Sequence, residues 1–145
     1  MASVKSVAIT NLDADPSVMS GGGNLSPMMV WHDTYEASSL ASGSDITIGR
    51  IPAGSTIHDV VLKCDALGGS STLKVGDAGD DDRYLAAVGT WNAAGQAQSM
   101  LAGSTAANTA VAGLGYKVSS ATDLKITTGG ASITGTIYFW VYYTQ

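Results

Sequence analysis

The sequence predicts an all-β fold in which two antiparallel sheets, with about eight strands between them, pack face to face as a β-sandwich. Helix signals are almost absent, because no window of the 145 residues keeps an apolar helical period over three turns without a glycine. Short β-branched runs recur instead, and Gly, Ser, Asn or Asp bound each run. The chain has 18 glycines, and we interpret them as turn positions between strands.

We expect strands where apolar or β-branched residues alternate with polar ones. In chain order these runs are 4–10, 28–37, 45–50, 57–67, 71–76, 109–112, 116–119, 123–128 and 133–143. The best helical candidate, 83–102, is interrupted by Gly89 and Gly95, and each glycine costs a helix about 1 kcal/mol. We therefore expect a long loop there, with one helical turn at most.

Two short segments predict changes of direction. In Ile51-Pro52-Ala53-Gly54 the proline presets φ and the glycine permits φ > 0. Gly68-Gly69-Ser70 joins the run 57–67 to the run 71–76. Residues 57–76 are therefore expected to form a hairpin.

The final run, 133–143, is the clearest strand, and its two faces differ. One face carries the side chains expected in a core, which are Ile133, Ile137, Phe139, Val141 and Tyr143. The other face begins with threonines and continues with Tyr138, Trp140 and Tyr142. Such an aromatic stripe needs cover, either from another part of this chain or from another chain.

The N-terminal segment differs in composition from the rest. Residues 11–27 contain Pro16, Gly21-Gly22-Gly23 and Pro27, which do not fit a strand and indicate a flexible connection. We expect residues 1–30 to form an extended N-terminal arm with this connection, and residues 31–145 to form the sandwich domain.

Composition and charge exclude several classes of protein. The formal net charge is −5 with seven basic residues, which lacks the basic surface of a nucleic-acid binder. The longest apolar run, 137–143, is far short of the roughly 20 residues of a membrane-spanning helix. No sustained apolar stretch follows Lys5, so we expect no signal peptide and no membrane partner.

Two further features of composition bear on the core and the surface. The single cysteine, Cys64, cannot form an intrachain disulfide, and we interpret it as a small buried hydrophobe without a reactive role. Only 13% of residues are charged, about half of the usual share of roughly 25%. This shortage is typical of a surface that becomes packed in an assembly.

No pattern of residues predicts catalysis. His32-Asp33 and His58-Asp59 are neighbours whose side chains point to opposite faces of a strand, so neither pair is a catalytic dyad. With Glu36, the two histidines could in principle bind zinc, but no ligand spacing supports that. The chain also lacks a Gly-x-Ser-x-Gly elbow. We expect no enzyme activity, no catalytic residue and no cofactor.

An acidic stretch, Asp77-Ala78-Gly79-Asp80-Asp81-Asp82, is the one candidate cation site. Several carboxylates within six residues can supply oxygen ligands to a hard cation. The spacing does not match an EF-hand loop, and no Glu closes it. A solvated Asp/Gly turn is the alternative interpretation, so we assign no metal ligand here.

Four aromatic residues are the candidate interface: Trp31, Tyr138, Trp140 and Tyr142. Tyr and Trp on a strand face can anchor a protein interface, where both are enriched. They can also stack on sugar rings, or form the buried face of a second sheet. The sequence leaves these three interpretations open.

Several segments resemble small virion proteins of tailed bacteriophages. These are Gly49-Arg50-Ile51-Pro52-Ala53-Gly54-Ser55-Thr56-Ile57, then Val60-Val61-Leu62, then Leu73-Lys74-Val75-Gly76-Asp77, then Asp82-Arg83-Tyr84-Leu85, and the long strand near the C-terminus. The likeness spans about residues 45–143. The type it resembles is the jelly-roll head cement, or decoration, protein of the Bordetella podophages.

This resemblance implies a jelly-roll-like sandwich that binds the outer surface of an icosahedral head. Such a protein, made in the host cytoplasm, stabilises contacts between major capsid subunits, often as a homodimer or other homo-oligomer. It has no catalytic residues to transfer to this chain. The expected partners are therefore the major capsid protein and further copies of the chain.

Two alternatives remain. The first is a carbohydrate- or receptor-binding β-sandwich module of a phage tail fibre, whose aromatic side chains would bind a host glycan. The second is a cupin-like metalloenzyme, for which two histidines are too few for the common metal-binding arrangement.

Overall fold

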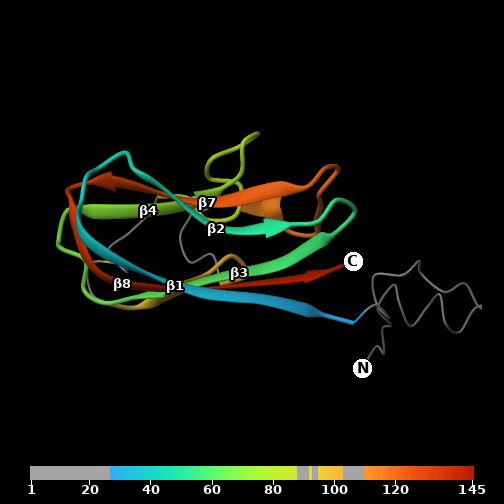
Figure 1. Cartoon of the computed structure of the whole chain (residues 1–145), viewed down its shortest axis with the longest axis horizontal. Helices are drawn as coiled ribbons and strands as arrows, with labels where there is room; N and C mark the ends of the chain where they lie inside the picture. The colour runs from blue at the N-terminus through green and yellow to red at the C-terminus, as the bar shows by residue number, and fades with distance from the viewer. Residues whose placement is uncertain (1–26, 88–91, 93–94, 103–109) are drawn as a thin grey trace, which may run out of the picture.

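A computed structural model describes residues 27–87, 92, 95–102 and 110–145. It confirms the predicted fold class: eight strands form one five-stranded and one three-stranded antiparallel sheet. Figure 1 shows them as two layers, with β2, β4 and β7 in the upper layer and β1, β3 and β8 in the lower one. Of the predicted arm, residues 1–26, with the run 4–10, lie outside the described residues, and Met29 and Val30 begin β1.

The five-stranded sheet is built around the C-terminal strand. β8 (Ile133–Thr144) lies between β1 (Met29–Leu40) and β3 (Thr56–Cys64). On its other side β3 pairs with two short strands, β5 (Ala97–Ser99) and β6 (Tyr116–Lys117). β1 is therefore an edge strand of this sheet.

The three-stranded sheet has β7 (Thr122–Gly130) at its centre. β2 (Asp45–Ile51) and β4 (Ser71–Gly76) pair with its two sides. A one-turn 3-10 helix, η1 (Ala110–Gly113), precedes β6, where the sequence predicted a strand at 109–112. Among the described residues η1 is the one helical segment, and no helix there could span a membrane.

The core lies between the sheets and follows the predicted alternation of β8. The core-facing residues of β8 are all buried, and their outward neighbours Tyr138, Trp140 and Tyr142 are half-buried. The largest fully buried side chains come from both sheets and the 77–87 loop: Ile51, Ile57, Val60, Leu62, Leu73, Val75, Tyr84, Leu85, Leu124, Ile126, Ile133 and Ile137.

The predicted hairpin at 57–76 is wrong, because β3 and β4 belong to different sheets. Gly68-Gly69-Ser70 does form a turn, in which the Ser71 amide donates to the Gly68 carbonyl at 3.3 Å. The chain crosses between the layers here, with Leu67 buried on the way. In separate sheets, the apolar faces of β3 and β4 both face the core, and each is covered by the other layer.

Cys64 lies buried in β3, as predicted, with its Sγ 3.6 Å from the Asn92 carbonyl oxygen. Burial, and secondarily the negative charge of Asp65, raises the pKa of the thiol to about 11. Because the thiolate is the reactive form, we expect a thiol reagent at pH 8 to label the folded protein at least 100-fold more slowly than the urea-unfolded protein. Rapid labelling of the folded chain would contradict this placement.

Candidate binding surface

The outward side of the five-stranded sheet carries an apolar patch. We call it the aromatic face and define it as Tyr138, Trp140 and Tyr142 of β8, Val30 and His32 of β1, and Val61 of β3. The strand register places these residues together, because Trp140 is opposite both His32 and Val61, and Tyr142 is opposite Val30. In Figure 1 no described segment lies beneath this layer.

Trp140 is the centre of the aromatic face. Its ring stacks on His32, with ring centroids 4.9 Å apart and an angle of 26° between the planes. Val61 flanks it from the other neighbouring strand. The stack with His32 holds the indole from one side, and a large aromatic held in this way is the usual anchor of a protein interface.

Polar and charged side chains surround the aromatic face. Thr136 donates its hydroxyl to Glu36 at 2.6 Å. Lys63 lies opposite Tyr138, and Asp59 lies opposite Tyr142. An apolar centre with a polar periphery is the anatomy of a protein–protein interface.

The structure separates Trp31 from the other three predicted interface residues. Trp31 is opposite Val141, whose side chain is buried, so its own side chain turns toward the inner side of the sheet. There the indole lies against Gly49 of β2, where an added Cβ would stand 3.0 Å from the ring. Trp31 borders a cleft of about 290 Å³ together with Asp33, Ile48, Arg50 and Asp123.

Sequence reasoning missed Val30, His32 and Val61, which complete the aromatic face. Alternation along 28–37 and 57–67 does group Val30 with His32, and Val61 with Lys63. Their proximity to Trp140 depends on strand order and register, which alternation within one strand does not contain.

The two His-Asp pairs have structural contacts in the described part of the chain. Asp33 accepts a hydrogen bond from the Thr34 amide at 2.8 Å. The His58 Nε2 lies 3.0 Å from the Thr144 hydroxyl. Asp59 accepts from the Ser99 hydroxyl at 3.0 Å and from the Leu101 amide at 3.1 Å. Asp59 therefore holds the end of β5 in place through these two hydrogen bonds.

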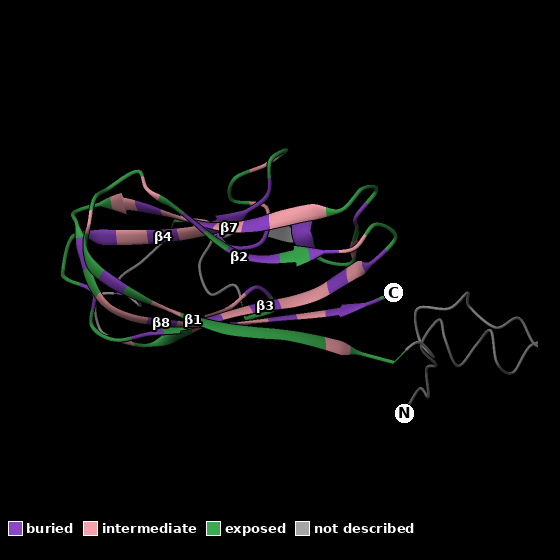
Figure 2. Cartoon of the chain, in the orientation of Figure 1, coloured by how far each residue is buried: buried purple, intermediate pink, exposed green. Residues whose placement is uncertain are grey.

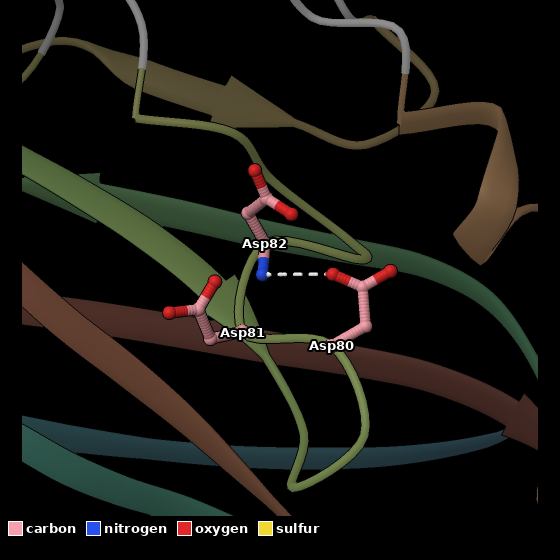
Figure 3. Close-up of side chains that lie close together, drawn as sticks. All are labelled: Asp80, Asp81 and Asp82. Carbon is pink, nitrogen blue, oxygen red and sulfur yellow. Dashed lines mark hydrogen bonds between the residues drawn. The ribbon is translucent and has the colours of Figure 1, made fainter.

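Possible metal ligands gather at one place among the described residues, Asp80, Asp81 and Asp82. Figure 3 shows the three carboxylates around a tight turn, with the Asp82 amide donating to Asp80 at 3.4 Å. A hydrogen bond to Asp80, some burial and the neighbouring negative charges raise the pKa of Asp82, while Asp81 pairs with Lys74. The histidines and Glu36 do not join this cluster. These observations describe an acidic turn and assign it no ligand.

Two segments named in the sequence analysis, 73–77 and 82–85, meet around the Asp77 side chain. The buried Asp77 carboxylate accepts from Arg83 Nε at 2.8 Å, the Tyr84 hydroxyl at 3.1 Å and the Gly79 amide at 2.9 Å. The Arg83 guanidinium also stacks 4.1 Å from the centre of the Tyr116 ring. Gly76 is required beside this turn, because an added Cβ would lie 2.2 Å from the Asp80 carbonyl oxygen.

The segment 49–54 has an equally structural explanation. Gly49 supports Trp31, and Arg50 pairs with Asp123 of β7 through two hydrogen bonds of 2.6 and 2.9 Å. Gly54 adopts φ 84° and donates its amide to the Val118 carbonyl at 2.7 Å. These contacts lie within the sandwich, and none of them involves a side chain of the aromatic face.

Comparisons with known proteins place this fold among phage capsid structures. No protein-family model and no curated protein matches the chain. A chain of the cyanophage Pam1 capsid asymmetric unit matches 86% of this chain and 89% of its own length, with a TM-score of 0.66 and 24% identity. A chain in the capsid of Ralstonia phage GP4 matches 88% and 90%, with a TM-score of 0.63 and 17% identity.

A third match is a chain in the acidic stable capsid structure of the Helicobacter pylori bacteriophage KHP30. It covers 83% of this chain and 89% of its own length, with a TM-score of 0.59 and 12% identity. At these identities the likeness establishes a shared fold. The coverage shares show that the matched chains are close to this one in length.

Replacing Asp77 by Asn should lower the free energy of unfolding by about 3 kcal/mol at pH 7, because the mostly buried Arg83 loses its charged partner. Burial alone would raise the pKa of Asp77, but hydrogen bonds from Arg83, Gly79 and Tyr84 outweigh it and lower the pKa. The ion pair therefore stabilises the fold above the carboxyl's ordinary pKa of 3.8. This stability is lost as the pH falls through the lower folded value.

Urea unfolding of both proteins between pH 7 and pH 2.5 measures this effect. The loss of stability below about pH 4 should be smaller in Asp77→Asn than in the unmodified chain. Asp123→Asn is the matched control, because the Asp123–Arg50 pair is exposed and screened by solvent. This variant should leave the urea midpoint of unfolding nearly unchanged. Equal changes in stability in the two variants would show that the buried Asp77–Arg83 pair stabilises the fold no more than the exposed Arg50–Asp123 pair.

Proposed function

We propose that the chain is a capsid cement, or decoration, protein that binds the outer surface of a tailed-phage head through its aromatic face. The partner is the major capsid protein, and the effect is to stabilise contacts between neighbouring capsid subunits. The observation that carries the proposal is an apolar face, centred on Trp140, that no described segment covers. The three matching chains come from phage capsid structures, which supports the same setting.

The mechanism is adhesive and needs no catalytic group. Burial of apolar surface contributes roughly 25 cal/mol per Å², before the costs of association. Because many copies would bind one head, contacts between copies add to the affinity through effective concentration. A low share of charged residues, 13%, suits a chain that buries much of its surface in this way.

The tail-fibre module that binds a glycan is the competing function, and one observation bears on it. His32 is stacked on Trp140, so one side of the indole is already occupied. A sugar ring would have to use the remaining side or the neighbouring tyrosines. Binding to phage heads that lack the protein separates the two functions, because only the cement function predicts it.

Trp140→Ala should weaken binding of the purified chain to such heads of the phage that encodes it by about thirty-fold, which corresponds to about 2 kcal/mol for a central aromatic anchor. Cosedimentation with the heads measures the affinity. Lys125→Ala is the control, because Lys125 lies on the outer side of the other sheet, where it pairs with Asp45 at 3.6 Å.

Circular dichroism should show that both variants keep the sandwich. Two results would contradict the proposal: full binding by Trp140→Ala, or no binding to heads together with binding of a glycan that depends on Trp140.

A further inference from the structure

No strand among the described residues pairs with the outer edge of β1. β1 has twelve residues and pairs with β8 alone among the described strands. Figure 2 shows it mostly exposed, in contrast to β8 beside it. An uncovered edge strand of this length is a template for a further strand, and proteins normally shorten or block such edges.

The register shows which backbone groups face the open edge. The Thr136 carbonyl accepts from the Asp65 amide at 3.0 Å, and the Thr136 amide donates to the Asp65 carboxylate at 3.0 Å. Both backbone groups of Thr136 therefore point toward β3. In an antiparallel pair, the residue opposite must then point its own groups away. Glu36 is opposite Thr136, and alternation extends the same outward direction to Thr34, His32 and Val30.

Exposed apolar side chains gather at the same edge. Five large hydrophobic residues are exposed among the described residues, and three of them are consecutive or nearly so: Met28 at 59%, Val30 at 52% and Trp31 at 40%. Val30 lies on the aromatic face, and Trp31 lies on the inner side beside the cleft of about 290 Å³. A strand added here would cover Val30 with one set of side chains and Trp31 with the other.

One segment of the chain outside the described residues fits this edge by its pattern. In residues 4–10, Lys5, Val7 and Ile9 alternate with small or polar residues. On an added strand, Val7 and Ile9 would face the cleft, where Trp31 and Ile48 supply apolar contacts. Lys5 would lie on the same side, where the carboxylates of Asp33 and Asp123 outnumber the guanidinium of Arg50.

The length of chain before β1 is enough for a neighbour to be the acceptor. The described chain begins at Pro27, two residues before Met29, the first residue of β1. Figure 1 shows the described chain entering at the tip of the lower layer. Residues 11–26 can span at most about 55 Å when extended, enough to reach a second molecule.

We infer that the open edge of β1 accepts residues 4–10 of a second copy of this chain as an added strand. The added strand would form backbone hydrogen bonds with Val30 and His32, would take the place of the Asp33 carboxylate at the Thr34 amide, and would bury Trp31. The inference concerns contacts between copies and requires no capsid. It can therefore fail while the proposed function stands, and the reverse is equally possible.

A pair of substitutions at Thr34 tests the edge in the full-length chain. Thr34→Pro removes an amide that faces the edge and spares the β1–β8 hydrogen bonds, as a proline on the solvent side of an edge strand does. Thr34→Ala keeps the amide and is the control. In sedimentation velocity, Thr34→Pro should raise the dissociation constant for self-association at least ten-fold, and Thr34→Ala should change it less than two-fold.

Cysteine cross-linking identifies the occupant and its source. Full-length Ala8→Cys and Thr34→Cys proteins are mixed and oxidised, with the buried Cys64 left in place. We expect a disulfide-linked heterodimer, whereas Val7→Cys, on the opposite side of the added strand, should link to Thr34→Cys at least ten-fold less. Mixing Ala8→Cys with His32→Cys, in place of Thr34→Cys, tests a pairing register of the added strand that is shifted by two residues.

The double variant Ala8→Cys/Thr34→Cys decides between two copies and one. Dimers or longer chains on a non-reducing gel support the inference. A cross-linked monomer would overturn it, because the segment would then return to its own edge. Absence of any cross-link at both Thr34 and His32, or unchanged self-association of Thr34→Pro, would also overturn it.

Discussion

The central position of β8 is the constraint on which the rest of the structure depends. With strands on both sides, its side chains can face only the core or the outside, and the two sets differ sharply. Ile133, Ile137, Phe139 and Val141 are buried against the other sheet. The same pleat therefore forces Tyr138, Trp140 and Tyr142 outward. The core cannot form without presenting three aromatic rings on the opposite face, so the aromatic face is a consequence of how the sandwich closes.

The segments around Arg50 and Asp77, which carry part of the resemblance to phage virion proteins, make contacts within the sandwich. Asp77 gathers Arg83 and Tyr84 into one buried network, and Arg50 links β2 to β7 through Asp123. These contacts position loops and strands. The surface available to a partner, in contrast, is built from residues of β1, β3 and β8 that strand pairing brings together.

The aromatic face and the outer edge of β1 lie side by side, and each is suited to a different kind of partner. The aromatic face offers apolar area and is suited to burial against a broad protein surface. The edge of β1 offers rows of backbone donors and acceptors and is suited to a strand. Because Val30 and His32 belong to both, occupation of the edge would extend the aromatic face by one strand. Contacts between copies and contacts with a head would then reinforce each other.

The sequence by itself determined the fold class, most strand positions and the two faces of β8, because these depend on alternation within one strand and on local turn residues. Only the tertiary structure decided which strands are neighbours. It placed β3 and β4 in different sheets, where Gly68-Gly69-Ser70 alone favoured a hairpin. It brought His32 and Val61 to Trp140 and turned Trp31 to the inner side. The physical reason is that pairing and register are set by burial of the whole core, through contacts between residues far apart in the chain.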